Sequence, residues 1–549
     1  MKKHYTKTLL FIALTLMAVF QLSAQTVEFL NANNVNAGIG IGGNLFSLLT
    51  DTAFDLYEVP RSSNKKAIYT ASLWMTGLDT GGNLYGAAQQ YSEFGPNYYD
   101  GPIASVYDSI YDKYYKRVFK VTQQQVNQYR ALTFPATAAQ VDSAILMWPG
   151  KGNPFVAASF GVNIGSGLAP FVDLNNNGFY EPLNGDYPAI CGDEAIFFAL
   201  NDVRGISGIV CQKLGVEIRG LASVFVDTLS TGLPPEKRVV NNTVFVEYEV
   251  ENKSATNYNN FYLGLFEDPD LGCFENDRVG CDTVRNMMFV YNGTTPDPDC
   301  QGETGYGNLT VSQGTIMLNK NMSSFGYYTN GTLLSQSDPT SCSQVRNYMT
   351  GYWNDGTPFT EGSTGYGGTI PTKFIFPGDP NDSTSWSELS AANILAPGDR
   401  RMTGSTGPVT FAIGDILHYD FAFSTSYDST STMFKIVDTL KHDADIVQAF
   451  YNNNILGCRS QLVAASVNEV KDGALSVSVF PNPANAQINI VAAENIQMLE
   501  MTDIEGRLVL QKGVTENRTT INTSIFARGV YLLKVKSEGR SVVKKIVLE

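Results

Sequence analysis

Alternating apolar and polar positions run through much of the chain and predict β-strands. In residues 244–250, Val244, Val246, Tyr248 and Val250 fall on one face of an extended backbone. Three further apolar stretches have the length and the β-branched or aromatic content of buried strands: residues 67–75, 261–266 and 417–424. Segments rich in Gly, Asn and Pro separate these stretches, and such residues are typical of loops.

Helical periodicity is scarce by comparison. The best helix candidate is residues 121–139, and the remaining long stretches are loops or strands. We therefore expect a mostly β protein, with a multi-domain, β-sandwich-like body that carries long loops.

The C-terminal residues repeat the strand pattern at short, regular spacing. Pro481 and Pro483 end the first strand, because proline cannot donate to a sheet ladder. Gly506 and Gly529 mark later turns. The expected strands are residues 477–480, 487–491, 499–503, 507–510, 530–535 and 542–548. This spacing predicts a small Ig-like β-sandwich at the C-terminus.

Several segments of this tail resemble a known export signal. They are residues 479–483 (VFPNP), 503–506, 529–535 (GVYLLKV) and 544–547. Together they resemble the type A C-terminal sorting domain of type IX secretion system cargo in Bacteroidota. The resemblance implies that residues 477–549 engage the secretion machinery, that the chain crosses the outer membrane, and that the tail is usually removed outside the cell. An ordinary Ig-like adhesive module is the alternative interpretation.

The N-terminus has the pattern of a secretory signal peptide. Lys2, Lys3 and Lys7 precede an apolar run at residues 9–20, and small residues lead to cleavage after Ala24. The apolar run is too short for a membrane span, and no later stretch is long enough for one. We expect a signal peptide at residues 1–24, a body at 25–468 with a sub-boundary near 150–170, a linker at 469–476 and the sorting domain at 477–549. The predicted route is Sec export through the periplasm to the outer cell surface or the medium.

The formal net charge of −15 argues against nucleic acid as a partner, because binding to phosphates requires excess Lys and Arg. The signal peptide contains three lysines and no acid, so the mature chain is still more acidic. An acidic exported protein is suited to collecting divalent cations, although acidity also serves solubility.

Seven cysteines in an exported chain are candidates for disulfides. Neighbours in sequence suggest the pairs Cys191–Cys211, Cys273–Cys281 and Cys300–Cys342, which leave Cys458 over. Spacing alone does not fix the connectivity.

The sharpest chemical motif is the segment DLNNNGFYE at residues 173–181. Its oxygen ligands would come from alternate positions, and Gly178 permits the sharp turn that brings them onto one cation. The site predicted for a structural Ca²⁺ ion comprises Asp173, Asn175, Asn177, the Phe179 carbonyl, Glu181 and Asp186. Asn184 replaces the bidentate Glu of an EF-hand. The alternative is an Asx-turn loop that binds no ion.

A second acidic cluster follows the predicted strand at 261–266. Asp268, Asp270, Asp277 and Asp282 would offer another cation site, although their spacing matches no standard loop. A solvated turn is an equally good interpretation.

Catalytic motifs are lacking: the sequence has no HExxH, GxSxG or P-loop, and only His418 and His442 follow the signal peptide. Glu247 and Glu249 would share a strand face about 6.6 Å apart, a separation compatible with a glycosidase carboxylate pair. Acids on strands are far more often exposed to solvent, so no catalytic residue is assigned.

Much of the body, from residue 33 to 423, resembles a group of exported Bacteroidota proteins that lack an assigned activity. The similar segments are residues 71–79, 84–91, 169–173, 185–188, 192–193, 266–272, 280–282, 291–293 and 398–401. The resemblance implies one family architecture and assigns no chemistry. We expect a calcium-stabilised surface protein with a binding or adhesion role, such as glycan contact. A secreted, glycosidase-like hydrolase and a structural envelope component are the alternatives.

Overall fold

The computed structural model of the chain forms two compact units, Met1–Leu462 and Val463–Glu549. It describes residues 26–48, 56–91, 97–165, 168–204, 209, 211–330, 334–391, 395–459, 477–492, 494–503, 507–537 and 540–548. The predicted signal peptide and the predicted linker lie outside these residues. Among them, no helix is both long and apolar enough to span a membrane.

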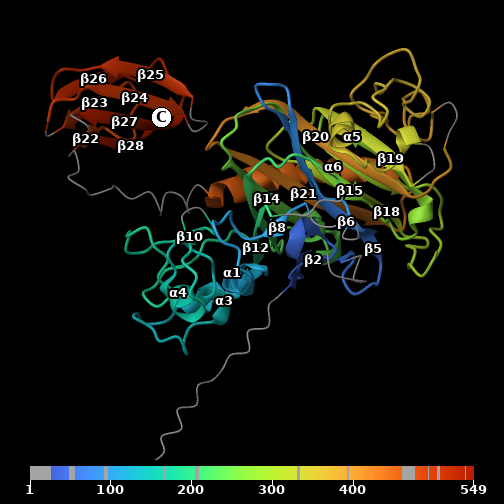
Figure 1. Cartoon of the computed structure of the whole chain (residues 1–549), viewed down its shortest axis with the longest axis horizontal. Coiled ribbons are helices and arrows are strands. Elements are labelled where there is room, and N and C mark those ends of the chain that lie inside the picture. The colour runs from blue at the N-terminus through green and yellow to red at the C-terminus, as the bar shows by residue number, and fades with distance from the viewer. Residues whose placement is uncertain are drawn as a thin grey trace, which may run out of the picture. The chain divides into compact units, whose positions relative to one another are not determined.

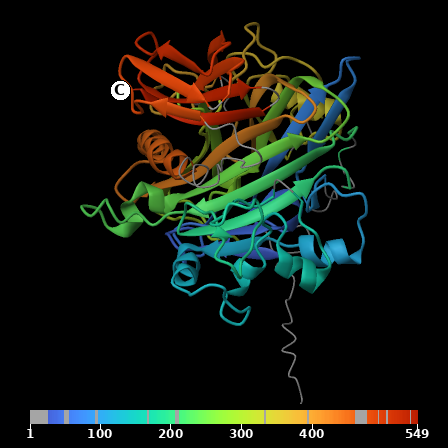
Figure 2. The same ribbon diagram turned by 90° about the vertical axis from the view of Figure 1, so that its left-hand side faces the viewer.

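Two large antiparallel sheets build the first unit, which we call the body (Figures 1 and 2). Sheet A has the order β19 (Ser324–Thr329), β20 (Arg400–Phe411), β15 (Tyr258–Asp268), β6 (Thr70–Leu78), β3 (Asn44–Leu45), β2 (Asn36–Gly40), β4 (Tyr57–Glu58) and β5 (Lys66–Ile68), with β1 (Val27–Leu30) on β2 and β7 (Leu84–Ala88) on β6. Sheet B has the order β16 (Asp277–Asp282), β17 (Met287–Asn292), β18 (Thr310–Met317), β21 (Ile416–Asp428), β14 (Thr243–Asn252), β13 (Val216–Val224), β12 (Glu194–Asn201) and β8 (Tyr99–Asp100), with β9 (Phe119–Thr122) on β12. The mostly β prediction is confirmed.

The main core lies between the two sheets. Val244, Val246, Tyr248 and Val250 of β14 are all buried in it, as the alternating pattern predicted. Glu267 of β15 accepts a hydrogen bond from Thr315 Oγ1 of β18, which shows that these faces of the sheets oppose each other. Because side chains alternate along a strand, Phe266 and Asp268 of β15 point to the opposite, outer face of sheet A.

Helices cover the outer faces. On sheet B, α6 (Lys435–Phe450) buries Ile436, Val437, Leu440, Ala444 and Val447, and it contacts β18 and β21. A second hydrophobic cluster gathers α1 (Ser109–Tyr115), α2 (Gln123–Arg130), α3 (Ser143–Leu146) and α4 (Pro154–Phe160) against β9 and β12. α5 (Cys342–Met349) contacts β6, β7, β15, β19 and β20 of sheet A.

The helix predicted at residues 121–139 is wrong in extent. β9 includes residue 121, and α2 starts only after Thr122, whose side chain forms a capping box with Gln125. The helix then stops at Arg130, ahead of Pro135. The pattern of residues 121–139 therefore combines a strand, a short helix and a loop.

Short elements complete the body. They are η1 (Ile41–Gly43), β10 (Phe171–Val172), β11 (Tyr187–Pro188), η3 (Pro235–Lys237), η4 (Val239–Asn242), η5 (Phe274–Asn276), η6 (Leu334–Gln336) and the π-helical turn η7 (Tyr451–Ile455).

The disulfide pairs expected from spacing are all wrong. The structure joins Cys191 to Cys458, Cys211 to Cys342 and Cys273 to Cys300. Cys281, expected to pair with Cys273, is the buried free thiol. It lies inside β16, where it donates to the carbonyl of Ile375, and the strand carries it away from Cys273. The pairs Cys191–Cys458 and Cys211–Cys342 join points 267 and 131 residues apart, because folding of the sheets brings remote segments together.

The C-terminal unit is a small two-sheet sandwich, as predicted. One sheet has the order β22 (Val477–Phe480), β23 (Gln487–Ala492) and β26 (Arg518–Asn522). The other has the order β25 (Leu508–Gly513), β24 (Met498–Asp503), β27 (Gly529–Ser537) and β28 (Arg540–Leu548). Ile488, Ile490, Leu499, Leu533 and Ile546 fill a core of its own.

Candidate functional site

The loop predicted to bind calcium is closed by the two-stranded pair β10–β11, in which Val172 lies opposite Tyr187. This pairing places Asp173 and Asp186 side by side at the loop's base. Asp173 Oδ1 accepts the backbone N–H of Asn176 (2.7 Å), and its Oδ2 accepts that of Gly178 (2.6 Å). Asp186 accepts the N–H groups of Leu174 and Glu181, each at 2.9 Å.

The remaining predicted ligands form a ring of side-chain hydrogen bonds. Glu181 Oε2 accepts from the amides of Asn175 (2.8 Å) and Asn177 (2.5 Å), so these amides present nitrogen rather than oxygen to the carboxylate. Phe179 is exposed, and Lys151 Nζ lies 5.0 Å from the centre of its ring. The loop therefore brings Asp173, Glu181 and Asp186 together in an arrangement that its own N–H groups satisfy. A cation would require the two Asn side chains to turn.

The second predicted acidic cluster divides into separate places. Asp277 is buried and accepts from the N–H of Leu271 (3.3 Å), and burial raises its pKa well above the usual value. Asp282 forms an ion pair with Arg285 (2.9 Å). Only Asp268 and Asp270 come together, in a pocket.

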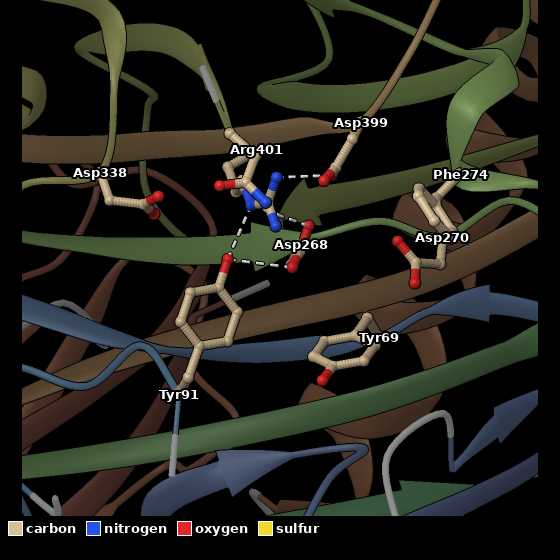
Figure 3. Close-up of a pocket in the computed structure, with 9 residues that line it drawn as sticks. Tyr69, Tyr91, Asp268, Asp270, Phe274, Asp338, Asp399 and Arg401 are labelled. Carbon is tan, nitrogen blue, oxygen red and sulfur yellow. Dashed lines mark hydrogen bonds and ion pairs between the residues drawn. The ribbon is translucent and has the colours of Figure 1, made fainter. Parts of the chain in front are cut away.

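This pocket has a volume of about 280 Å³ and opens on the outer face of sheet A (Figure 3). β15 ends at Asp268, where its antiparallel neighbours β6 and β20 begin. The residues that precede or follow these strand ends therefore gather at one point. The lining residues are Tyr69, Tyr91, Asp268, Asp270, Phe274, Asn330, Asp338, Asp399 and Arg401.

Arg401 organises the polar side of the pocket. Its Nη1 lies 2.6 Å from Asp399 Oδ1, and its Nε donates to the Tyr91 hydroxyl at 2.7 Å. The Tyr91 hydroxyl donates in turn to Asp268 Oδ2 at 3.0 Å. Figure 3 shows these contacts as one connected chain from Asp399 to Asp268.

Aromatic side chains form the other side. The ring centres of Tyr69 and Tyr91 lie 6.3 Å apart in an edge-to-face arrangement, and both lie beside Asp268 in Figure 3. Below them, Phe266 contacts Tyr91 edge to face (5.7 Å) and stacks on Trp74 (5.3 Å). This packing fixes the Tyr91 ring, while Tyr69 stays half-buried at the opening.

Burial and neighbouring charges perturb the acids of the pocket. Loss of solvation raises the pKa of Asp268 to about 7, although the Arg401 guanidinium opposes this shift. Burial also raises the pKa of Asp338, and Asp399 adds to that shift. The pocket lining holds four carboxyl groups and one guanidinium, so it attracts cations and hydrogen-bond donors.

Glu247 and Glu249, the only acids considered as a catalytic pair, have separate partners on sheet B. Glu247 is paired with Arg459, which also lies 2.9 Å from Asp420. Glu249 is paired with Arg219 at 2.9 Å. Burial raises the pKa of Glu247 to about 7 despite Arg459. Each glutamate forms an ion pair with a different arginine, so the sequence argument for a catalytic carboxylate pair is not supported.

Sequence reasoning missed most of the pocket. Tyr91, Asp399 and Arg401 appeared only within segments that resemble a group of exported proteins, Tyr69 only within a predicted strand, and Asp338 not at all. The usable signal was the sequence FEDPD, an acidic pair that directly ends an apolar strand.

The comparisons with known proteins bear mainly on the tail. The family model described as "Secretion system C-terminal sorting domain" matches residues 478–549. No curated protein matches the chain. Among solved structures, a polysaccharide lyase is similar over 60% of this chain, at 8% identity and a TM-score of 0.17. The similarity spans 34% of the lyase chain, about a third of its length, and is too slight to bear on fold or activity.

The match and the sandwich fold of the tail agree with each other. Both cover the strands from β22 to β28, which form a unit with its own core. The C-terminal unit is a type IX secretion system sorting domain, and the chain is cargo that this system exports to the outer cell surface or the extracellular medium.

Proposed function

We propose that the exported body is a binding protein that contacts glycans at the cell surface through the pocket on sheet A. The observation that carries this proposal is the pairing of an aromatic wall, Tyr69 and Tyr91, with the anchored polar chain of Arg401, Asp399 and Asp268. Sugars offer apolar ring faces and hydroxyl donors, and this pocket offers a surface for each.

The size of the pocket favours binding a single sugar unit. Its volume of about 280 Å³ lies at the small end of ligand sites. Tyr69 and Phe274 are half-buried and Asn330 is exposed, so the opening is lined by side chains that a ligand reaches from solvent. A glycan end or one branch residue fits these dimensions better than a long polymer.

Glycan-array and calorimetric binding measurements on the full chain test this proposal. Tyr69→Ala is expected to weaken binding about fivefold, because a ring–ligand contact contributes on the order of 1 kcal/mol. The matched control is Tyr352→Ala, which removes an exposed ring outside the pocket. Equal affinity in the two variants, or no glycan bound by the parent, contradicts the proposal.

A secreted hydrolase is the second candidate. It is favoured by the raised pKa of Asp268, about 7, beside Asp270 and Asp399 in one pocket. A carboxyl group that stays protonated near neutral pH is suited to a general acid. Against it, Asp268 is held by Tyr91 and Arg401. Release of reducing ends from the bound glycans, lost in Asp270→Asn, supports hydrolysis, and unchanged glycans support binding alone.

We also propose that calcium stabilises the loop of residues 173–186. The support is the convergence of Asp173, Glu181 and Asp186, three hard oxygen donors, around one turn. Calcium is expected to raise the melting temperature of the full chain, and a chelator to lower it again. Asp173→Ala is expected to remove the part of the calcium-dependent rise in melting temperature that this loop contributes. The exposed control Asp382→Asn is expected to keep it. An equal calcium response in both variants rules the loop out.

A further inference from the structure

Three carboxylates of the pocket meet closely enough to share one metal ion. One oxygen from each of Asp268, Asp270 and Asp399 lies within 4.8 Å of the other two. Oxygens that bind one Ca²⁺ at about 2.4 Å are separated by at most about 4.8 Å, since they lie on a sphere around the ion. The residues come from the end of β15 and from the segment just before β20, which sheet pairing holds together.

A buried oxygen in this group accepts no hydrogen bond. Asp268 is only 2% exposed, and its Oδ1 receives no donor among the described residues. The Arg401 Nε that lies 3.4 Å away directs its hydrogen bond to Tyr91 instead. This oxygen therefore has Arg401 as an ion-pair partner but receives no hydrogen bond, so it can still accept a bound cation.

The charge of the pocket points the same way. Among the described residues of the lining, Arg401 is the one cation, and it faces the carboxyl groups of Asp268, Asp270, Asp338 and Asp399. If all four acids are ionised, the lining carries three net negative charges in a small, half-enclosed volume. A divalent cation relieves this repulsion more fully than a hydrogen-bonded water can.

We infer that the pocket binds a divalent cation, with Ca²⁺ as the best match, through Asp268, Asp270 and Asp399. Carboxylate oxygens are hard ligands, and no described His or unpaired Cys lies in the pocket lining to favour a softer metal. The site is distinct from the loop at residues 173–186.

The cation gives the proposed glycan site its selectivity, an extension that rests on the proposed function. Ca²⁺ takes six to eight oxygen ligands, and three carboxylates leave positions open toward the cavity. Adjacent sugar hydroxyls can fill two of them while the ring lies against Tyr69 or Phe274. The expected ligand class is therefore a sugar with a free vicinal diol.

Terbium luminescence tests the cation site directly. Tb³⁺ replaces Ca²⁺ and is excited through nearby aromatic rings, which Tyr69 and Tyr91 supply. Full-length Asp173→Ala serves as the background, so that the other loop does not contribute. We expect saturable luminescence that Ca²⁺ displaces, and a tenfold or greater loss of affinity in Asp270→Asn and in Asp399→Asn.

The control in the same background is Asp382→Asn, an exposed acid outside the pocket. It should match the background. Thermal unfolding shows that each variant is folded, and the half-buried Asp399 gives a second variant if Asp270→Asn is unstable. Absence of saturable luminescence, or affinities in the pocket variants equal to the control, overturns the inference.

Glycan binding measured with calcium and with chelator separates the two proposals. Terbium binding without any glycan binding upholds the metal site and contradicts the glycan role. Glycan binding that persists in chelator, with no terbium signal, upholds the glycan role and contradicts the metal site. Loss of glycan binding on chelation, restored by Ca²⁺, supports both.

Discussion

Burial is the main cause of the raised pKa of Asp100. It is 5% exposed, and its Oδ1 accepts the backbone N–H of Gly42 at 2.8 Å. Loss of solvation raises the pKa of this carboxyl to about 7, although Lys116 lowers it, while Asp112 adds to the rise. The folded chain therefore binds this proton more tightly than the unfolded chain, in which the pKa is about 4.

Stability should therefore fall as the pH rises from about 4 through 7, because the unfolded chain releases this proton near pH 4 whereas the folded chain holds it up to about pH 7. Asp100→Asn keeps an acceptor for Gly42 and cannot ionise. We expect the variant to gain about 2–4 kcal/mol in unfolding free energy relative to the parent between pH 4 and pH 8. Denaturant unfolding across this range measures the difference. A difference between variant and parent that does not change with pH contradicts the prediction.

Single residues also show where sequence reasoning stops. The loop at residues 173–181 was visible because its ligands are close in sequence, and β10–β11 does bring Asp173 and Asp186 together. The pocket was not visible, because Tyr91 and Arg401 meet only through the strand order of sheet A. The disulfide partners were also not predictable, because folding joins cysteines that are remote in sequence, such as Cys191 and Cys458.

At the scale of elements, the strands were predictable and α6 was overlooked. Apolar and polar positions alternate within the few residues of a strand, so β14 and β15 could be recognised from the local sequence. The α6 pattern was also present: Ile436, Val437, Leu440, Ala444 and Val447 recur at helical spacing and are the buried face. The extent of α2 was harder to predict. The capping box at Thr122 starts the helix, which already ends at Arg130 and is followed by a loop.

The cover that α6 forms over sheet B gives a direct prediction. Leu440 is fully buried and packs over Gly314 of β18, where a Cβ would lie 3.1 Å from its side chain. Leu440→Ala should cost about 2–5 kcal/mol, through lost burial and the cavity left behind. Denaturant unfolding measures this cost. Thr439→Ala, on the exposed side of the same helix, should change stability little; equal losses in both variants refute the packing described.

At the scale of the whole molecule, export depends on the C-terminal unit. Deleting residues 479–549 removes the strands from β23 to β28 and leaves the body's own core intact. We expect the truncated chain to accumulate in the periplasm, because the sorting domain is missing. Fractionation and surface labelling with protease measure its location. Surface display of the truncated chain equal to that of the full chain would contradict the sorting role of the C-terminal unit.

The fold class and the tail were predictable from the sequence because both rest on local patterns. The arrangement of the body was not. β15 pairs with β6 and β20, whose residues lie far from it in sequence, and no local pattern specifies such neighbours.

The Cys191–Cys458 bond also determines how the molecule carries mechanical load. Cys458 is close to the end of the body's described residues, and its bond leads straight to Cys191, just before β12. A pull applied to the C-terminus thus crosses to residue 191 through sulfur. It bypasses the intervening chain, which includes most of sheet B and the strands β15, β19 and β20 of sheet A. Under tension during passage through the outer membrane, those strands would bear no load and would stay paired.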